Sequence, residues 1–520
     1  MALSVSKTLK RDTKARLGRP FIRAVVYASV ASLLLSCAQD QPSTNTLRVA
    51  VQGLPPMMGN PYRSTGIPNI YTMGAIFDGL TRIDANGDVQ PWLATHWENT
   101  GPLNWVFHLR DDVSFSNGVP FTADAVVKVV EYFVSEYAVR EMVARELNFI
   151  DHAIAIDTHT VEFVTNRPMP LLPRSLPIMY IVEPGQWQRL GPLEFGKQPV
   201  GTGPFKVESF NPNVIEFSAF EGSWRRPKVD RLAMISILDT ASRAQAVQSG
   251  SADIAMSIGP TEVRAIERAG GYAVNRGAAS VWSINFILDY PDSPFKDRRV
   301  RQAVNYAVDR ETLTQTILDG VAIPANQPGS PVCFGYNPDL PPIPFDPPAA
   351  RKLLAEAGYP DGFKFVVQGT LGSNAAASDV FQVIAQDLAK IGVEMEIRPV
   401  TVAELIRNVV EGGWEGEAFS LNYNHEPSVD VLRGLNNHSC RWHHAWYCDE
   451  RIMPTIEEAW LEFDPERALQ LRHEVMAFYR DEYASLFLYD FAYFAGLAAG
   501  VSGFEDVHGF ISFENIDKQP

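Results

Sequence analysis

The stretch LNWVFHLRDDVSFSNGVPFTADAVV, residues 103–127, carries three structural signals in direct succession. Apolar and aromatic residues between Trp105 and Phe115 predict a β-strand. A Ser-Asn-Gly sequence follows and predicts a tight turn. From Thr122 to Tyr137 the apolar residues recur with helical spacing, and Thr122 is placed to cap the first turn. The stretch therefore predicts a strand, a turn and an amphipathic helix.

The same alternation continues along the chain. Residues 69–80 and 297–318 have helical spacing, and another helix is predicted after the Pro-rich passage at residues 323–348. Strand patterns occur in LRVAVQG, HTVEFVT, VIEFSAF, LAMISIL and KFVVQGT. Helices alternate with single or consecutive strands, so the sequence predicts an α/β fold with mixed sheets.

Length and charge limit the possible function. A chain of 520 residues predicts two or three domains. Residues 1–36 carry a net charge of +6, which leaves −22 on the remainder of a chain whose total is −16. Nucleic-acid binding requires a basic patch, so we expect no nucleic-acid partner for this acidic body. Such a charge suits a soluble monomer outside the cytoplasm.

The N-terminus has the pattern of an export signal. A basic segment ends at Arg23, and twelve mostly apolar residues, 24–35, follow it. That length suits a signal peptide and is too short to span a bilayer; a short buried helix is the alternative. The sequence Leu-Leu-Ser-Cys ending at Cys37 resembles the lipobox of bacterial lipoproteins. It implies a signal peptide over 1–36, a lipidated Cys37 that anchors the protein to a membrane, and a tether over 37–46.

Several blocks together resemble one protein family. They are the opening stretch and, in order along the chain, GAIFDGLTRIDANGDVQPWLATHWE, VGTGPFKVESF, SGSADIA, WSINF, FKDRRVRQAVNYAVDR and RKLLAEAGYPDGF. From about residue 47 to 500 the chain resembles the family 5 solute-binding proteins of bacterial ABC transporters, the dipeptide, oligopeptide and nickel class. The resemblance implies a binding protein without a cofactor, not an enzyme. It would deliver a peptide-like or other small polar solute to an ABC permease and ATPase complex.

The resemblance also implies a two-lobed clamshell with an extra subdomain in the first lobe. Lobe one would comprise 47–288 and 491–520, with the subdomain at about 81–199, and lobe two would comprise 289–490. Hinge closure around the solute would be the functional motion. We expect an extracytoplasmic location, on the periplasmic side or at the cell surface.

Candidate solute contacts lie in FSLNYNHEPSVDVL, residues 419–432. In peptide-binding relatives an Asp four residues before the Pro of an acid-Pro pair binds the α-ammonium of the ligand. Here the pair is Glu426-Pro427, and Tyr423 stands at the place of that Asp. Glu426 or Asp430 could substitute for it, and His425 could donate to a carbonyl; ordinary surface acids are the alternative. The candidates in this segment are Asn422, Tyr423, His425, Glu426 and Asp430.

Three further candidates lie elsewhere. The resemblance places Trp414 near the cleft and places Asn60 and Tyr62 where relatives contact their ligand. A structural Trp and an ordinary turn are the respective alternatives. The loop at residues 368–378 lacks the Arg that some dipeptide binders use for the ligand carboxylate. Its absence weakens a dipeptide interpretation and leaves room for a bulkier or uncharged ligand.

The sequence CRWHHAWYC, residues 440–448, raises the question of a metal site. Its spacing is not a standard zinc pattern, and the expected compartment is oxidising. Some relatives carry a small disulfide loop here, so the resemblance implies a Cys440–Cys448 disulfide, with His443 and His444 as rim residues. Metal binding and free thiols remain alternatives, and Cys333 is left over.

Competing functions remain open at this stage. A metal or metal-chelate binding protein of the nickel type is the main alternative. An extracytoplasmic hydrolase is disfavoured, because we find no convincing GxSxG, HExxH or SxxK signature. A binding protein whose lobes signal to a sensor instead of a permease is a further alternative.

Overall fold

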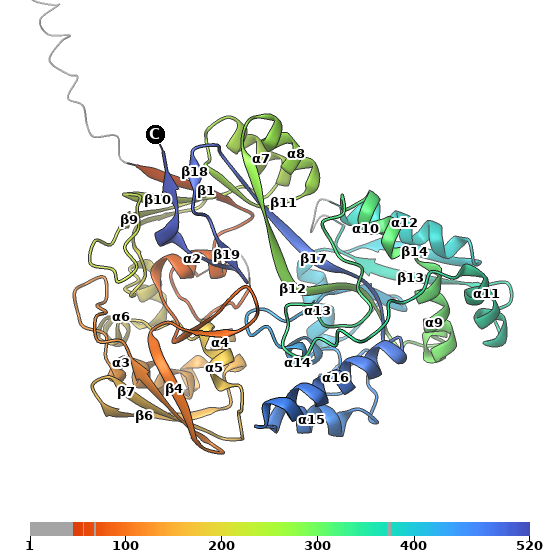
Figure 1. The fold of residues 1–520 in the computed structure, drawn as a ribbon, viewed down its shortest axis with the longest axis horizontal. Helices are drawn as coiled ribbons and strands as arrows, with labels where there is room; N and C mark the ends of the chain where they lie inside the picture. Colours follow the sequence, from red (N-terminus) through yellow and green to blue (C-terminus); the bar gives the residue numbers. More distant parts are fainter. Residues whose placement is uncertain (1–44, 56, 67–68, 372–375, 520) are drawn as a thin grey trace, which may run out of the picture. The chain divides into compact units, whose positions relative to one another are not determined.

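The computed structural model describes residues 45–519, except residues 56, 67–68 and 372–375 (Figure 1). The predicted signal peptide, the lipidated Cys37 and all but the last two residues of the tether lie outside the described residues. From Asn45 onward the chain forms one compact unit. Within the described residues, every helix is too short or too polar to cross a membrane.

The largest sheet mixes parallel and antiparallel strands, as the sequence predicts. Its order is β14-β13-β15-β12-β17-β11-β1-β10-β9-β8, and β16 pairs with β12 beside this path. Strand β1 is parallel to β10 and β11, whereas β12 is antiparallel to β15 and β17. The strands are β1 (Thr46–Val51), β8 (Phe205–Asn211), β9 (Val214–Ala219), β10 (Arg231–Ser236), β11 (Ile254–Ile258), β12 (Tyr272–Phe286), β13 (Phe363–Gly369), β14 (Val393–Pro399), β15 (Ala418–Ser420), β16 (Tyr423–Asn424) and β17 (Ser485–Leu497).

Two long neighbouring strands, β12 and β17, connect separate hydrophobic cores (Figure 1). Two clusters of buried apolar residues draw on residues 47–266 and 494–516. Two other clusters draw on residues 278–489, to which Ile83 is added. The chain therefore passes from one set of cores to the other within β12 and returns within β17.

A second, antiparallel sheet contains the opening stretch of the sequence. Its order is β4-β5-β7-β6, and α3 (Ala123–Phe133) packs beside it. Its strands are β4 (Ala94–Gly101), β5 (Asn104–Leu109), β6 (Ile150–Asp157) and β7 (Thr160–Thr165). Strand β5 ends six residues before the predicted Phe115, and α3 ends at Phe133, not at Tyr137. Tyr137 is 77% exposed, so burial does not favour continuing the helix to that residue.

The predicted helix at residues 297–318 is two helices, α9 (Arg298–Ala307) and α10 (Arg310–Thr316). Val308 is extended, and Asp309 caps α10 by accepting a hydrogen bond from the backbone of Thr312 (3.0 Å). The buried guanidinium of Arg310 binds the carbonyl of Asn305 (2.9 Å) and its side chain (2.7 Å). These contacts satisfy backbone groups at the break, so the interruption leaves few of them unpaired.

The remaining elements cover the sheets and form the connections. The helices are α2 (Asn69–Ile76), α4 (Met142–Glu146), α5 (Leu172–Ser175), α6 (Pro184–Lys197), α7 (Thr240–Gln248), α8 (Pro260–Arg268), α11 (Pro347–Glu356), α12 (Ala377–Ala389), α13 (Val402–Glu411), α14 (Val431–Leu435), α15 (Met453–Leu461) and α16 (Pro465–Asp481). One-turn 3-10 helices lie at Glu136–Ala138, Leu176–Ile178, Pro294–Lys296 and Phe513–Asn515. Short strand pairs are β2 (Thr81–Ile83) with β3 (Val89–Pro91), β18 (Val501–Ser502) with β21 (Asp517–Lys518), and β19 (Asp506–Val507) with β20 (Phe510–Ile511).

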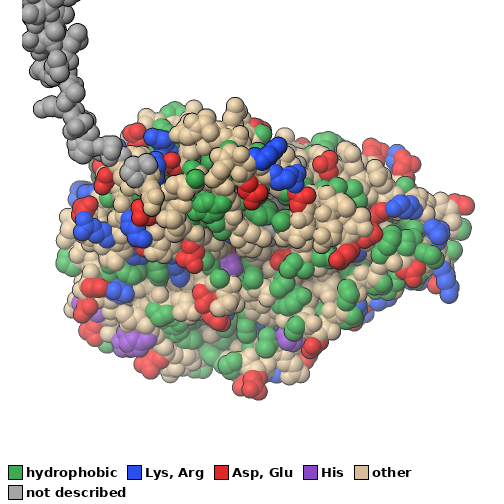
Figure 2. All heavy atoms as spheres, turned by 45° about the horizontal axis from the view of Figure 1, so that its top comes forward, with side chains coloured by type: hydrophobic (Ala, Val, Ile, Leu, Met, Phe, Trp, Pro, Cys, Tyr) green, Lys and Arg blue, Asp and Glu red, His purple; other side chains and the backbone are tan. Residues whose placement is uncertain are grey.

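The surface has no single dominant charge on the face that Figure 2 shows. Acidic and basic side chains are interspersed there, and hydrophobic side chains lie between them. Among the described residues on this face, the basic side chains form no continuous patch.

Candidate functional site

The segment that carries five of the predicted contacts runs from β15 to the start of α14. Strands β15 and β16 both pair with β12, which brings the segment beside the long strands that connect the cores. Asn422 is half-buried, whereas Tyr423, His425, Glu426 and Asp430 are buried.

Tyr423 and His425 point into protein. The hydroxyl of Tyr423 hydrogen-bonds the Ser485 hydroxyl (2.8 Å), and its ring stacks on His438 with centroids 3.7 Å apart. His425 Nε2 lies 2.8 Å from the Pro328 carbonyl and Nδ1 lies 3.2 Å from the Asp430 carbonyl. Burial lowers the pKa of His425 to about 4, so the ring is neutral at pH 7 and donates to only one of the two carbonyls.

Asp430 belongs to a complete ion pair. Its carboxylate receives two hydrogen bonds from Arg472, of 2.9 and 3.1 Å, and one from the backbone of Leu432 (2.9 Å). Burial favours the neutral form, but the Arg472 guanidinium outweighs burial and lowers the pKa of Asp430 overall. The carboxylate caps α14 and needs no ligand to satisfy its charge.

Asn60 and Tyr62 lie in the core built by residues 47–266. Tyr62 donates its hydroxyl to the Tyr180 carbonyl (2.8 Å) and is 0% exposed. The Asn60 side chain accepts from the backbone of Tyr62 (3.0 Å) and reaches Glu141 (3.4 Å). These hydrogen bonds are those of an ordinary buried turn. That Asn60 and Tyr62 contact the solute remains a prediction.

Trp414 lies beside the disulfide region. Its ring stacks on Phe419 at 3.8 Å between centroids and meets the edge of Trp446 at 6.4 Å. The residue is half-buried and packs against the same core as Tyr423. A role for Trp414 in contacting solute remains a prediction.

Glu426 is the predicted residue that joins a buried group of charges from distant segments. Arg276, in β12, donates to Glu426 (2.5 Å) and lies 3.1 Å from Asp506, in β19. All three side chains are largely shielded, with 3%, 10% and 1% of the side chain exposed, respectively. Burial raises the pKa of Asp506, although Arg276 opposes this shift.

Asp490, in β17, adds a third carboxyl group. Burial raises its pKa to about 7, a hydrogen bond with the Ser330 side chain opposes this shift, and the charge of Glu426 adds to it. One of its oxygens, Oδ1, is buried without a hydrogen-bond partner among the described residues. We call Arg276, Glu426, Asp490 and Asp506 the Arg276 cluster.

Aromatic and imidazole groups surround the Arg276 cluster. Burial raises the pKa of Tyr71 well above its usual value, and the charge of Asp506 contributes. His508 Nε2 lies 3.1 Å from the Asp84 carbonyl, and burial lowers the pKa of this ring. Tyr493 presents its ring 5.3 Å from the Arg276 guanidinium. The neighbourhood is therefore apolar enough to strengthen electrostatic interactions within it.

The Arg276 cluster has more carboxyl groups than cations. Glu426 and Asp506 face the Arg276 guanidinium, and Asp490 lies near Glu426. Nη1 of Arg276 lacks a hydrogen-bond partner in the described part of the chain. The cluster can accept a cationic group or a hydrogen-bond donor at Asp490, and the carboxyl group of this residue changes its protonation state near neutral pH. Sequence reasoning missed Arg276, Asp490 and Asp506. The available signal was a single charged residue inside each of two apolar strand patterns, VNRGAASV and LFLYDFAYF.

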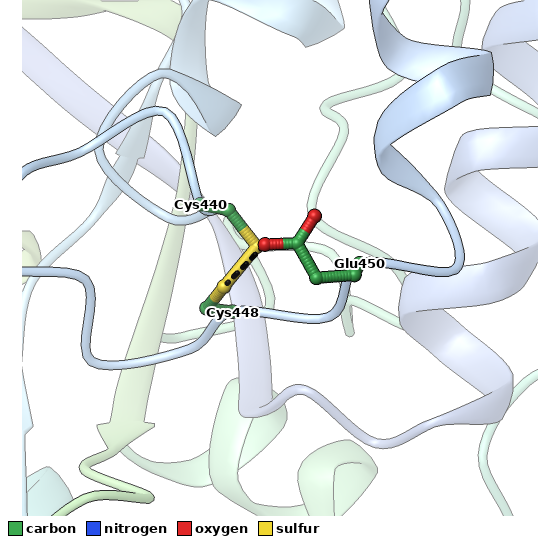
Figure 3. A group of neighbouring side chains, drawn as sticks. All are labelled: Cys440, Cys448 and Glu450. Carbon is green, nitrogen blue, oxygen red and sulfur yellow. Dashed lines mark hydrogen bonds between the residues drawn. A yellow bond between two sulfur atoms is a disulfide. The ribbon is translucent and has the colours of Figure 1, made fainter.

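The predicted Cys440–Cys448 disulfide is present (Figure 3). Glu450 lies beside it, and these three residues form the one group of three or more potential metal ligands among the described residues. A cysteine in a disulfide has no thiolate to bind a metal. Of the three residues, Glu450 alone therefore keeps a group that can bind a metal while the disulfide is intact. His443 Nε2 donates to the Val410 carbonyl (2.8 Å), which ties the loop to α13.

His438 lies two residues before the disulfide loop. Its side chain is buried, and the residue is 1% exposed. Burial lowers its pKa to about 3, so the ring is neutral at pH 7. The disulfide loop and its histidines therefore brace α13 and the core around Tyr423.

Comparison with known proteins identifies the family. Residues 88–428 match the family described as "Bacterial extracellular solute-binding proteins, family 5 Middle". The chain belongs to this family. Its members are the solute-binding components of ABC importers, a class of binding proteins, so the predicted function as a solute-binding protein is confirmed.

One similar protein is the glutathione-binding protein GsiB of Pectobacterium atrosepticum. It is 28% identical over 355 residues, which cover 67% of this chain and 68% of that protein.

Two solved structures show the same fold. The periplasmic binding protein DppA of Helicobacter pylori, in complex with the peptide STSA, has a TM-score of 0.77 at 21% identity and covers 91% of this chain and 98% of its own. NikZ of Campylobacter jejuni, in complex with Ni(L-His), has a TM-score of 0.77 at 20% identity and covers 91% of this chain and 100% of its own. The predicted two-lobed α/β fold is confirmed by this likeness.

Proposed function

We propose that this solute-binding protein carries a peptide-like solute with a free ammonium group, and that the Arg276 cluster holds this group. The observation that carries the proposal is Asp490, a half-buried residue near Glu426 whose carboxyl Oδ1 is buried without a hydrogen-bond partner among the described residues.

The electrostatics of the cluster favour a cation. A carboxylate that is shielded from water without a cationic partner costs free energy, and the carboxyl group of Asp490 therefore keeps its proton up to about pH 7 despite a hydrogen bond with Ser330. A solute ammonium beside Asp490 would replace that proton and supply charge-assisted hydrogen bonds. Glu426 stands one residue before the Pro of the acid-Pro pair, in the segment where the family resemblance places the ammonium site.

Two of the similar proteins support this solute class. GsiB is named for glutathione, and the DppA structure holds the peptide STSA. Peptides of this kind carry an ammonium group together with amide and carboxylate groups. The absence of an Arg from residues 368–378 means that this chain would hold the carboxylate end differently from some dipeptide binders.

A cationic metal chelate is the second candidate. The same surplus of carboxyl groups would attract it, and NikZ holds Ni(L-His). Among the described residues, the one group of three or more ligands with the geometry of a metal site is Cys440, Cys448 and Glu450, and its two cysteines are joined in a disulfide. A chelate would therefore be held through its organic ligand and its net charge.

The remaining parts of the proposal follow from the sequence. We propose a monomer without enzymatic activity, anchored through lipidated Cys37 outside the cytoplasm, that presents its solute to an ABC permease and ATPase complex. Replacing Cys37 by Ala should release the protein from the membrane fraction. Membrane retention of that variant would contradict the anchor.

Native mass spectrometry of protein purified without refolding would identify a retained solute directly. Thermal-shift assays would then compare a peptide pool, the same pool with N-acetylated termini, and nickel with histidine. A ligand raises the melting temperature only if it binds the folded state. We expect free peptides to raise the melting temperature and acetylated peptides to lack this effect.

Asp490→Asn tests the residue that carries the proposal. We expect it to weaken peptide binding at least tenfold, because it removes a charge from the ammonium site. Asp111→Asn makes the same chemical change at an exposed residue and should leave binding unchanged. Equal stabilisation by acetylated peptides, or unchanged affinity in Asp490→Asn, would overturn the proposal.

A further inference from the structure

Two histidines face each other on the four-stranded sheet, which shares no strand with the large sheet that holds Arg276 and Asp490. His96 lies in β4 and His108 in β5, and the two residues are direct partners in the antiparallel pairing of these strands. Their rings are nearly parallel, with an interplanar angle of 9°, and the centroids lie 4.1 Å apart. The pairing of the strands therefore holds two imidazole groups side by side. We call them the His96–His108 pair.

The ring nitrogens of this pair are open to a ligand. The Thr95 hydroxyl directs its single proton to the His108 carbonyl (3.1 Å). Its oxygen therefore accepts a hydrogen bond from Nδ1 of His96 (3.0 Å). A neutral imidazole that carries its proton on Nδ1 has a lone pair on Nε2. Among the described residues, neither Nε2 of His96 nor the ring of His108 has a hydrogen-bond partner.

Solvent and negative charge both reach the face that carries the pair. Strand β4 is the last strand at one edge of its sheet, and His96 is exposed. Residues two apart along a strand point to the same side, so exposed Glu98 shares the face of His96. Glu162, in β7, is the strand partner of Val106 and shares this face as well. Two carboxylates on one face favour a cation there over an anion.

The spacing of the two rings suits a metal ion after a small adjustment. An ion with metal–nitrogen bonds of about 2.0–2.1 Å holds two neighbouring nitrogen ligands about 3 Å apart. The ring centroids are 4.1 Å apart, so the rings must tilt toward each other by roughly 1 Å. The torsion between a histidine ring and its Cβ has a broad range. Because His96 is exposed, its ring can make this tilt without disturbing the core.

A second pair of histidine rings lies in contact among the described residues, and it lacks these features. The rings of His443 and His444 have centroids 4.5 Å apart, but their planes are inclined by 56°. Nε2 of His443 donates to the Val410 carbonyl (2.8 Å). A nitrogen that donates carries a proton and has no lone pair for a metal. The comparison therefore favours the His96–His108 pair.

We propose that the His96–His108 pair binds one divalent late transition-metal ion, and that Cu²⁺ binds most tightly. Nε2 of His96 and one nitrogen of His108 are the protein ligands, and water completes the coordination. Imidazole suits copper, nickel and zinc, and Cu²⁺ has the highest affinity of these divalent ions for a given set of ligands. Thr95 is a positioning residue, because its hydroxyl fixes the tautomer and orientation of the His96 ring. The site is separate from the one that we propose for the solute.

Isothermal titration calorimetry of the full chain with Cu²⁺ tests this site, with glycine in the buffer as a weak competing chelator. We expect a binding event of one Cu²⁺ per chain. His96→Asn and His108→Asn should each weaken it at least tenfold, because each variant leaves a single imidazole in place of a chelating pair. The double variant should bind little worse than either single variant, since the chelate is already lost. Ni²⁺ and Zn²⁺ should bind more weakly than Cu²⁺.

Electron paramagnetic resonance provides a readout that folding alone does not change. The spectrum of the copper complex should show two nitrogen ligands, and each single variant should show one fewer. His152→Asn is the matched control, because His152 is exposed in β6 and contacts Asp151 (2.7 Å). It should leave both the affinity and the spectrum unchanged. Equal weakening by His152→Asn would indicate adventitious copper only, and this result or the absence of the binding event would overturn the site.

Thr95 gives a finer test of the geometry. Thr95→Val removes the acceptor of the His96 Nδ1 proton and should weaken copper binding severalfold. Thr95→Ser keeps a hydroxyl and should restore the affinity. Equal weakening by both variants would contradict the positioning role of the hydroxyl.

Asp490→Asn separates this site from the proposed solute site. We expect copper to bind this variant with unchanged affinity, because the His96–His108 pair lies in another sheet. Loss of copper binding in Asp490→Asn would assign the ion to the Arg276 cluster and overturn a separate site. If no peptide binds at all, the proposed function fails, while the copper titration still decides the histidine site.

Discussion

The Arg276 cluster and the pair of Asp430 with Arg472 both hold charges that are shielded from water, but their charge balance differs. The first has three carboxyl groups and one guanidinium, and the second has one of each. The carboxyl groups of Asp430 and Asp490 show the consequence. Arg472 lowers the pKa of Asp430, whereas burial without such a partner raises the pKa of Asp490 to about 7. Paired buried charges support the fold, and unpaired ones are available to a ligand.

The largest effect should come from breaking a complete pair. Arg472→Met leaves Asp430 buried without its partner and removes hydrogen bonds to the carbonyls of Ala459 and Ala468. We expect the free energy of unfolding to fall by about 3–5 kcal/mol, with little change in peptide affinity. Urea denaturation measures the first quantity and calorimetry the second.

Arg467→Met is the control for this change, because Arg467 makes an exposed pair with Glu458. It should cost about 1 kcal/mol or less. Equal destabilisation by the two variants would remove the distinction between paired structural charges and ordinary surface charges.

The next effect concerns pH and Asp490. Its pKa is about 7 in the folded protein and near 4 in the unfolded chain, so the folded state holds a proton between these values. The stability that this proton contributes is fully present below about pH 4 and is lost as pH rises through 7; it amounts to roughly 4 kcal/mol at most. Relative to the native protein, Asp490→Asn should therefore be more stable at pH 8 than at pH 5.

The comparison with Asp490→Asn is needed because other groups titrate in the same range. His425 and His438 have folded pKa values of about 4 and about 3, so their neutral forms stabilise the fold above about pH 6.5, and this stability is lost as pH falls. Urea denaturation of both proteins at pH 5 and pH 8 isolates the contribution of Asp490. Parallel pH profiles for the two proteins would contradict an unpaired carboxyl group at this residue.

The disulfide should affect stability without affecting either site. Replacing Cys440 and Cys448 by Ser opens a nine-residue loop and should lower the free energy of unfolding by about 2–3 kcal/mol through chain entropy. The loop contacts α13 and not the Arg276 cluster, so peptide affinity should stay the same. A large loss of affinity would instead place the loop at the solute site.

The smallest effect is expected at Tyr423. Tyr423→Phe removes one hydroxyl that bonds Ser485 and should cost about 1 kcal/mol, with unchanged peptide affinity. Calorimetry with peptide measures the affinity. A tenfold loss of affinity would show that Tyr423 reaches the solute and would move the solute site from Asp490 toward the core of lobe two.

The opening stretch shows how far local patterns predict the fold. Its strand and helix exist, but β5 ends at Leu109 and α3 at Phe133. The helix predicted at residues 297–318 divides because Arg310 and Asp309 satisfy the backbone at the break. Residue periodicity predicts which residues are helical, whereas long-range hydrogen bonds and burial set the ends. The lobe boundaries stay a prediction, although the hydrophobic cores change within β12 and β17.

The functional site was less accessible to the sequence than the fold. Glu426 was recognisable from its acid-Pro pair, but its partners Arg276 and Asp506 lie 150 and 80 residues away. Asp490 is the one charged residue in an apolar strand pattern, and that pattern does not indicate whether its carboxyl group has a partner. Asn60, Tyr62, Trp414, Tyr423, His425 and Asp430 were also candidates, and the structure gives each of them partners within the protein.

By itself the sequence determined the α/β class and the family, because these depend on local periodicity and on ordered blocks. The resemblance to that family implied the disulfide. Only the tertiary structure decided which charges are paired. A carboxyl group's state depends on burial and on the nearest guanidinium, and both are set by segments that meet only after folding. For this reason Asp430 and Asp490 look alike in the sequence, yet the carboxylate of Asp430 is paired with Arg472 and caps α14, whereas Asp490 keeps one oxygen without a hydrogen-bond partner among the described residues.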